Sequence, residues 1–191
     1  MDSRVLILVI VLVVAIVIVA AVFITRKRRS EHLRQQFGPE YDNAVKQHGD
    51  PSRAEAVLIQ REKRVEKFPI RALNPADRER YTGEWSAVQR RFVDDPSGAV
   101  TEADKLVTTV MAARGYPMGD FEQRAADISV HYPSVVQNYR SAREITLRHA
   151  KGESSTEDLR RAMVHFRSLF DELLETPKNQ TLGASHERLA S

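Results

Sequence analysis

The chain has 191 residues, and its 29 Lys and Arg side chains nearly balance its 26 Asp and Glu side chains, which leaves a formal net charge of +3. It contains no cysteine, so disulfide bonds, thiolate metal sites, a cysteine nucleophile and a lipidated N-terminal cysteine are all excluded. The part that follows Arg29 is long enough for one domain with a buried core.

An unbroken apolar run, Val5–Ile24, contains no glycine, proline or charged residue. As a helix it would be about 30 Å long, which matches the hydrocarbon thickness of a bilayer. We therefore predict a short tail at residues 1–4 and a transmembrane helix at residues 5–25 that contacts the lipid bilayer. A cleavable signal peptide carries its positive charges before the apolar stretch, whereas this chain carries four of them after it. We therefore interpret the helix as a membrane anchor that is not cleaved.

Four consecutive cations follow the apolar run: Arg26, Lys27, Arg28 and Arg29. An excess of Lys and Arg marks the cytoplasmic end of a transmembrane helix. We therefore expect a single-pass protein of the cell membrane, with its N-terminus outside and its C-terminal domain in the cytoplasm. The cluster also accounts for most of the basic pI of about 9.3, so a nucleic-acid partner is not expected. The four cations either only determine the orientation of the helix in the membrane, or they also contact anionic lipid headgroups.

Residues 26–49 read as a basic juxtamembrane segment and a linker helix. Glu31–Phe37 can continue the first helix, and Gly38-Pro39 interrupts it because a residue before proline avoids helical geometry. Three further pairs, Asp50-Pro51, Asn74-Pro75 and Asp95-Pro96, mark helix starts. The Asx side chain can accept from an unpaired backbone amide, and proline loses no hydrogen bond at the first helical position.

Apolar side chains recur at helical spacing after each of these starts, and Gly115 can end the third helix in a left-handed conformation. Residues 116–120 read as a turn, and helices are expected over Phe121–Val130 and Val135–Ala150. Ser155 and Asp158 frame the start of a last helix that ends near residue 177. Its broad apolar face comprises Leu159, Ala162, Met163, Phe166, Leu169, Phe170, Leu173 and Leu174.

No segment has the alternation of a strand. The predicted fold class is therefore all-α: one transmembrane helix, then a cytoplasmic multi-helix bundle with short Asx-Pro-capped connections at residues 50–177. Residues 178–191 contain few apolar side chains and read as a mobile tail. At helical spacing, Tyr81 and Trp85 are expected in the core, and the charged runs at 61–64 and 78–80 read as solvated helix surfaces.

Five segments together resemble an uncharacterised bacterial family of short, membrane-anchored helical proteins: Arg91–Pro96, Glu102–Val107, Val110–Pro117, Phe121–Asp127 and Thr156–Arg160. The resemblance covers roughly the last two-thirds of the chain. It implies a bacterial origin, and it carries no activity, ligand or catalytic residue with it. The chain departs from the family at His131-Tyr132-Pro133, where the family has Asp-His before the proline, so no role is transferred to His131.

No pattern in the sequence specifies a reaction. The six histidines are scattered without ligand spacing, and no phosphate-binding glycine loop, nucleophile elbow or dinucleotide fingerprint is present. We expect no metal, no cofactor and no enzymatic activity. The most notable polar residues flank the turn at 116–120, and they are Asp104, Arg114, Tyr116, Arg124, Asp127 and His131.

Two interpretations of these polar residues are open. They form either a small pocket for a ligand or peptide, or a structural ion pair in which a partly buried Asp127 pairs with Arg124 or Arg114. The second is favoured. The expected function is therefore a protein-binding or scaffolding module at the cytoplasmic membrane face, and its oligomeric state stays open. The alternatives are an unrecognised membrane-bound enzyme, which would use Asp104, Asp127 and His131, and an anionic-lipid or nucleic-acid binder that uses residues 26–29.

Overall fold

The computed structural model describes residues 3–175, with side chains from residue 11 onward. This part of the chain forms eight α-helices and no strand, which confirms the all-α fold class. The predicted tail at 178–191 and the first two residues of the tail at 1–4 lie outside the described residues.

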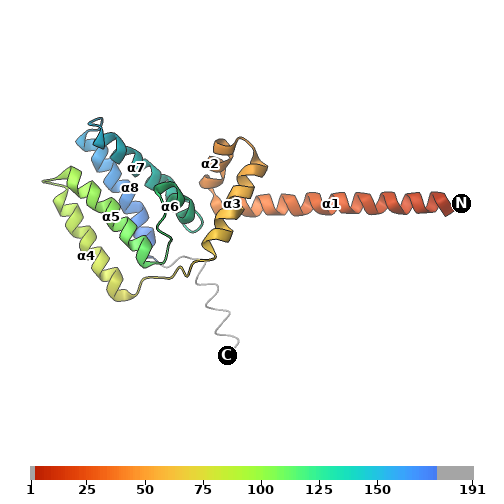
Figure 1. Ribbon diagram of the computed structural model, residues 1–191, viewed down its shortest axis with the longest axis horizontal. Helices are drawn as coiled ribbons and strands as arrows, with labels where there is room; N and C mark the ends of the chain where they lie inside the picture. Colours follow the sequence, from red (N-terminus) through yellow and green to blue (C-terminus); the bar gives the residue numbers. More distant parts are fainter. Residues whose placement is uncertain (1–2, 176–191) are drawn as a thin grey trace, which may run out of the picture.

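The first helix, α1 (Ser3–Phe37), extends away from the rest of the molecule (Figure 1). Every side chain from Val11 to Arg29 is exposed, and the most exposed apolar ones, Val19 and Phe23, reach 68%. Farther along the same helix, Leu33 and Phe37 are buried. The helix thus runs without a break from an exposed apolar stretch into a packed core.

Among the residues that the structure describes, no helix is both long enough and apolar enough to cross a membrane. The run Val5–Ile24 begins before Val11, where the described side chains start. The transmembrane helix at residues 5–25 stays a prediction.

The end of α1 packs with α2 (Pro39–His48) and α3 (Pro51–Val65), and we call this group the basal unit. The chain turns from α1 into α2 at Gly38, whose φ of 45° lies in the left-handed region that glycine tolerates. The core of the basal unit comprises Leu33, Phe37, Tyr41, Ala44, Ala54, Leu58, Val65 and Val130. All of these side chains belong to residues 33–65 except Val130, which follows α6 and joins the basal unit to the rest of the molecule.

The other five helices form the bundle: α4 (Pro75–Arg91), α5 (Pro96–Ala113), α6 (Phe121–Ile128), α7 (Val136–Ala150) and α8 (Thr156–Leu174). In Figure 1, α4, α5, α8 and α7 lie side by side, and their contacts confirm this order. Tyr81 and Trp85 are buried as predicted, and the Trp85 ring stacks on Phe170 at 4.6 Å between centroids. Trp85 is the only tryptophan in the sequence, so its fluorescence reports on the packing of the bundle.

The predicted helix starts are confirmed at atomic detail. The side chains of Asp50, Asn74 and Asp95 each accept a hydrogen bond from the backbone amide three residues later, at 2.8–2.9 Å. Ser155 and Asp158 form a reciprocal capping box at the start of α8. The predicted domain boundary between residues 26–49 and 50–177 stays a prediction, although α3 packs mainly with α1 and α2.

The turn after α5 depends on a glycine. Gly115 has a φ of 94°, and a Cβ atom there would lie 2.8 Å from the backbone oxygen of Pro69. We expect Gly115→Ala to lower the free energy of unfolding by about 2 kcal/mol, since it adds both strain and a backbone clash. Chemical denaturation monitored by Trp85 fluorescence measures this change.

Gly83 is the matched control, because it lies inside α4 and a Cβ atom there meets nothing within 4 Å. Gly83→Ala should raise the free energy of unfolding by about 1 kcal/mol through helix propensity. Equal effects of the two alanines would contradict the role assigned to Gly115.

Candidate functional site

The six polar residues predicted around the turn do not converge on one pocket. Arg114, Tyr116 and His131 lie close together, while Asp104 lies 3.7 Å from Arg143 and belongs to a different cluster. Burial raises the pKa of the Asp104 carboxyl, and its Oδ1 atom has no hydrogen-bond partner among the described residues. Within the described part of the chain, no three His, Asp or Glu side chains are placed to hold a metal ion.

Arg114 is fully buried and acts as a structural connector. Its Nε atom donates to the backbone oxygen of Arg71 at 3.1 Å. One terminal nitrogen donates to the Tyr132 hydroxyl and to the backbone oxygens of Leu173 and Glu175, at 2.7 and 3.1 Å for the two oxygens. These contacts place a cation at the C-terminal end of α8, where the helix dipole favours positive charge. Arg114 therefore joins the segment before α4 to α5 and α8.

Tyr116 and His131 share a hydrogen bond of 2.8 Å between the tyrosine hydroxyl and Nδ1. Burial lowers the pKa of His131 below its usual 6.5, and the nearby Arg114 charge lowers it further. Burial likewise raises the pKa of Tyr116. The pair is thus held in its neutral form, with His32, Glu62 and Glu66 lining the same shallow cavity beside His131.

The lowered pKa of His131 predicts a pH dependence of stability. The unfolded chain takes up a proton near pH 6.5 and the folded chain only at lower pH, so His131 stabilises the fold above about pH 6.5 and loses this contribution as the pH falls. His131→Gln should flatten the fall in the free energy of unfolding between about pH 7 and 5. Denaturation curves across this range measure it, and an unchanged slope would contradict the prediction.

Asp127 is fully buried and has a cationic partner, as the ion-pair interpretation requires. The partner is Arg64 of α3, whose Nε lies 3.0 Å from Oδ1, and the predicted partners Arg124 and Arg114 are wrong. Gln123 also donates to Asp127 at 2.9 Å. Arg124 instead donates to the backbone oxygen of Gly119 at 2.7 Å. The ion pair therefore joins the basal unit to α6, where the sequence had indicated a contact local to the turn.

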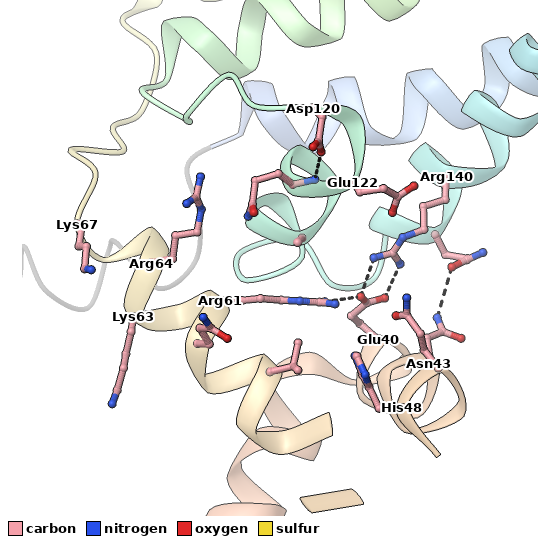
Figure 2. A pocket seen from close by; sticks show the side chains of 16 residues that line it. Glu40, Asn43, His48, Arg61, Lys63, Arg64, Lys67, Asp120, Glu122 and Arg140 are labelled. Carbon is pink, nitrogen blue, oxygen red and sulfur yellow. Dashed lines mark hydrogen bonds and ion pairs between the residues drawn. The ribbon is translucent and has the colours of Figure 1, made fainter. Parts of the chain in front are cut away.

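This pair borders a groove of about 960 Å³ between the basal unit and the bundle. Figure 2 shows the groove from close by, with α3 on one side and the residues of α6 and α7 facing it. Its lining includes one side of α3, where Val57, Gln60, Arg61 and Arg64 follow one another at helical spacing. We call it the interface groove.

A buried acid forms the floor of the interface groove. Glu40 of α2 is 2% exposed and accepts from Arg61 of α3 at 2.7 Å and from both terminal nitrogens of Arg140 of α7, at 2.7 and 2.8 Å. Figure 2 shows both guanidinium groups directed at this one carboxylate. The two arginines lower the pKa of Glu40 below its usual value and outweigh the opposing effect of burial. Arg61 also donates to Ser129 at 3.2 Å.

The prediction that residues 61–64 form a solvated surface is wrong for Arg61, whose side chain is only 11% exposed. The Arg64 side chain is 41% exposed and also reaches the buried Asp127. Sequence reasoning also missed Glu40 and Arg140. A signal was present, because Glu40 shares the buried face of α2 with Tyr41 and Ala44. An acid on the apolar side of a helix requires a buried cationic partner.

The predicted membrane-surface residues lie outside the groove. Arg26, Lys27, Arg28 and Arg29 are all exposed on α1, between the exposed apolar stretch and the buried Leu33. Four consecutive residues cover most of the circumference of a helix, at about 100° per residue. The cations therefore form a girdle around α1.

Comparisons of the chain with protein-family models, with curated proteins and with solved structures find no match.

Proposed function

We propose that this protein is a single-pass membrane protein whose helical domain binds another protein at the cytoplasmic face. The observation that carries the proposal is the exposed apolar stretch of α1, in which each described side chain from Val11 to Ile24 is apolar and open to its surroundings. A helix that is apolar on all sides is stable in lipid or in a protein core, and the bundle does not cover this one. Together with residues 5–10, the run has the length of a bilayer span.

The girdle of Arg26, Lys27, Arg28 and Arg29 supports the orientation. It immediately follows the apolar run, and Lys and Arg beside a span favour the cytoplasmic side. The basal unit begins at Leu33, about one turn farther along the helix. This arrangement would hold the interface groove close to the inner membrane surface.

Binding of a partner is supported by the interface groove, which lies between two separately packed groups of helices. The candidate catalytic residues Asp104, Asp127 and His131 each have a different set of partners. The enzyme thus stays an alternative without a supporting geometry, and the lipid or nucleic-acid binder stays an alternative that would use the exposed girdle.

The absence of cysteine allows a direct test of insertion and orientation. Single variants Ser3→Cys and Ser52→Cys of the full chain are treated in intact cells with a maleimide that does not cross membranes. We expect Ser3→Cys to react in intact cells and Ser52→Cys only after lysis. Release of the protein from membranes by alkaline carbonate, or the reverse labelling pattern, would refute the proposed anchor or its orientation.

Partner binding is tested in the same membranes with a photo-crosslinking residue in the groove. At position 60, where Gln60 lines the groove and is exposed, it should give a discrete adduct with one protein. At position 79, an exposed site on α4 outside the groove, it should not. Identical products from the two positions, or none from position 60, would speak against the groove as the binding site.

A further inference from the structure

The interface groove is lined by more cationic than acidic side chains. Its lining contains five cationic and three acidic side chains, and these are Arg61, Lys63, Arg64, Lys67 and Arg140 against Glu40, Asp120 and Glu122. Two of the acids are already engaged, since Glu40 binds two arginines and Asp120 accepts from the Gln123 amide at the start of α6. Arg64 is also paired, with the buried Asp127, so the five cations exceed the neighbouring acids by one.

The unpaired part of this excess lies at one end of the groove. Lys63 lies on the last turn of α3 and Lys67 just beyond it, and both are exposed. Figure 2 shows both lysines on the α3 side of the groove. No ion pair or side-chain hydrogen bond among the described residues includes either lysine. They present two ammonium groups without a carboxylate partner.

The rest of the lining is rich in carboxamides. Five of them come from α2, α3, α6 and α7: Asn43, Gln47, Gln60, Gln123 and Gln137. Gln47, Gln60 and Gln137 are exposed, and only Gln137 among these three has a side-chain partner, Asn43 at 3.4 Å. A carboxamide carries both donors and an acceptor, which are the groups that an extended peptide backbone needs from its binding site.

We infer that the interface groove binds an extended acidic segment of a partner protein. The carboxamides hydrogen-bond its backbone, and Lys63 and Lys67 bind its Asp or Glu side chains. The chain's own last residues, 176–191, do not have this charge, because they contain one acid, Glu187, against Lys178 and Arg188. This inference rests on the proposed function, since it names the partner segment for the same groove.

The test uses the full chain in nanodiscs of phosphatidylcholine, whose surface is neutral overall. A phage library of random heptapeptides is selected on the wild-type protein, and selected peptides are then titrated by fluorescence anisotropy. The expected peptides are enriched in Asp and Glu and bind more weakly as salt concentration rises. Lys63→Glu/Lys67→Glu should weaken their binding by about tenfold, because both ion pairs become repulsive.

Two variants separate the contributions. Lys105→Glu/Lys151→Glu makes the same charge change at exposed positions outside the groove and should leave the affinity unchanged. Gln60→Ala/Gln137→Ala should weaken acidic peptides and their Asn/Gln analogues by the same factor, since it removes contacts to the backbone only. Trp85 fluorescence, which reports on the bundle, and far-ultraviolet circular dichroism, which also reports on the basal unit, confirm that each variant is folded.

Selected peptides without an acidic excess, or equal selection on the Lys63→Glu/Lys67→Glu variant, would overturn the inference. So would a selection that yields no peptide while a polyuridine oligonucleotide binds the groove. In each of these cases, a position-specific adduct at residue 60 would still leave the proposed protein-binding function standing. Its absence would remove both.

Discussion

Replacing Arg114 with methionine is expected to lower the free energy of unfolding by about 4 kcal/mol, because the buried backbone oxygen of Leu173, the buried Tyr132 hydroxyl and the part-buried backbone oxygen of Arg71 lose their donor. The loss should be largest in the bundle, where these groups meet α5 and α8. Denaturation followed by Trp85 fluorescence measures it directly.

Two comparisons make the Arg114 prediction specific. Arg114→Lys keeps the charge but has a single nitrogen in place of Nε and the terminal nitrogen, which bind different acceptors, so an intermediate loss is expected. Arg78→Met alters an exposed arginine of α4 whose side chain has no partner in the described structure, and it should change stability by less than about 0.5 kcal/mol. If Arg114→Met resembled Arg78→Met, Arg114 would not be a structural connector.

Glu40→Gln should cost about 3 kcal/mol, since it leaves Arg61 and Arg140 without their shared buried carboxylate. The loss should appear as separation of the basal unit from the bundle. Far-ultraviolet circular dichroism would then show a transition that precedes the change in Trp85 fluorescence. A single coincident transition of wild-type midpoint would exclude this role of Glu40.

The Glu40→Gln variant should also change how the free energy of unfolding depends on pH. In the wild type, the lowered pKa of Glu40 stabilises the fold above about pH 4.5, and this contribution disappears as the pH falls through the folded-state pKa below that value. Glu40→Gln lacks the contribution at every pH, so the two proteins should converge in stability under acid conditions. Glu79→Gln, at an exposed position of α4, is the matched control and should follow the wild type.

The features that can be predicted from the sequence are those that depend on residues close together in the chain. Asp50, Asn74 and Asp95 cap their helices by bonds to amides three positions later, so the pattern and the contact lie in the same short segment. The burial of Tyr81 and Trp85 likewise follows from spacing along one helix.

The candidate site depends on contacts between distant segments, which no local pattern specifies. Arg140 and Glu40 are separated by 100 positions, and Arg64 and Asp127 by 63. The charged run at 61–64 has the composition of a solvated surface, and only the packing of α3 against α2 and α6 brings its arginines to buried acids. Local composition thus identified the helices and left the choice of ion-pair partners open.

Because α1 is continuous, the length of the proposed tether sets the direction in which the interface groove faces around the helix axis. Each residue of a helix adds about 1.5 Å and 100° of rotation, and no glycine or proline interrupts α1 between the apolar stretch and Leu33. One residue inserted between Arg29 and Ser30 would therefore turn the interface groove by about a quarter-turn around the tether axis without detaching it. Seven inserted residues would nearly restore the original direction and lift the groove by about 10 Å. The direction in which the groove faces is thus encoded in the number of residues in the helix that carries it.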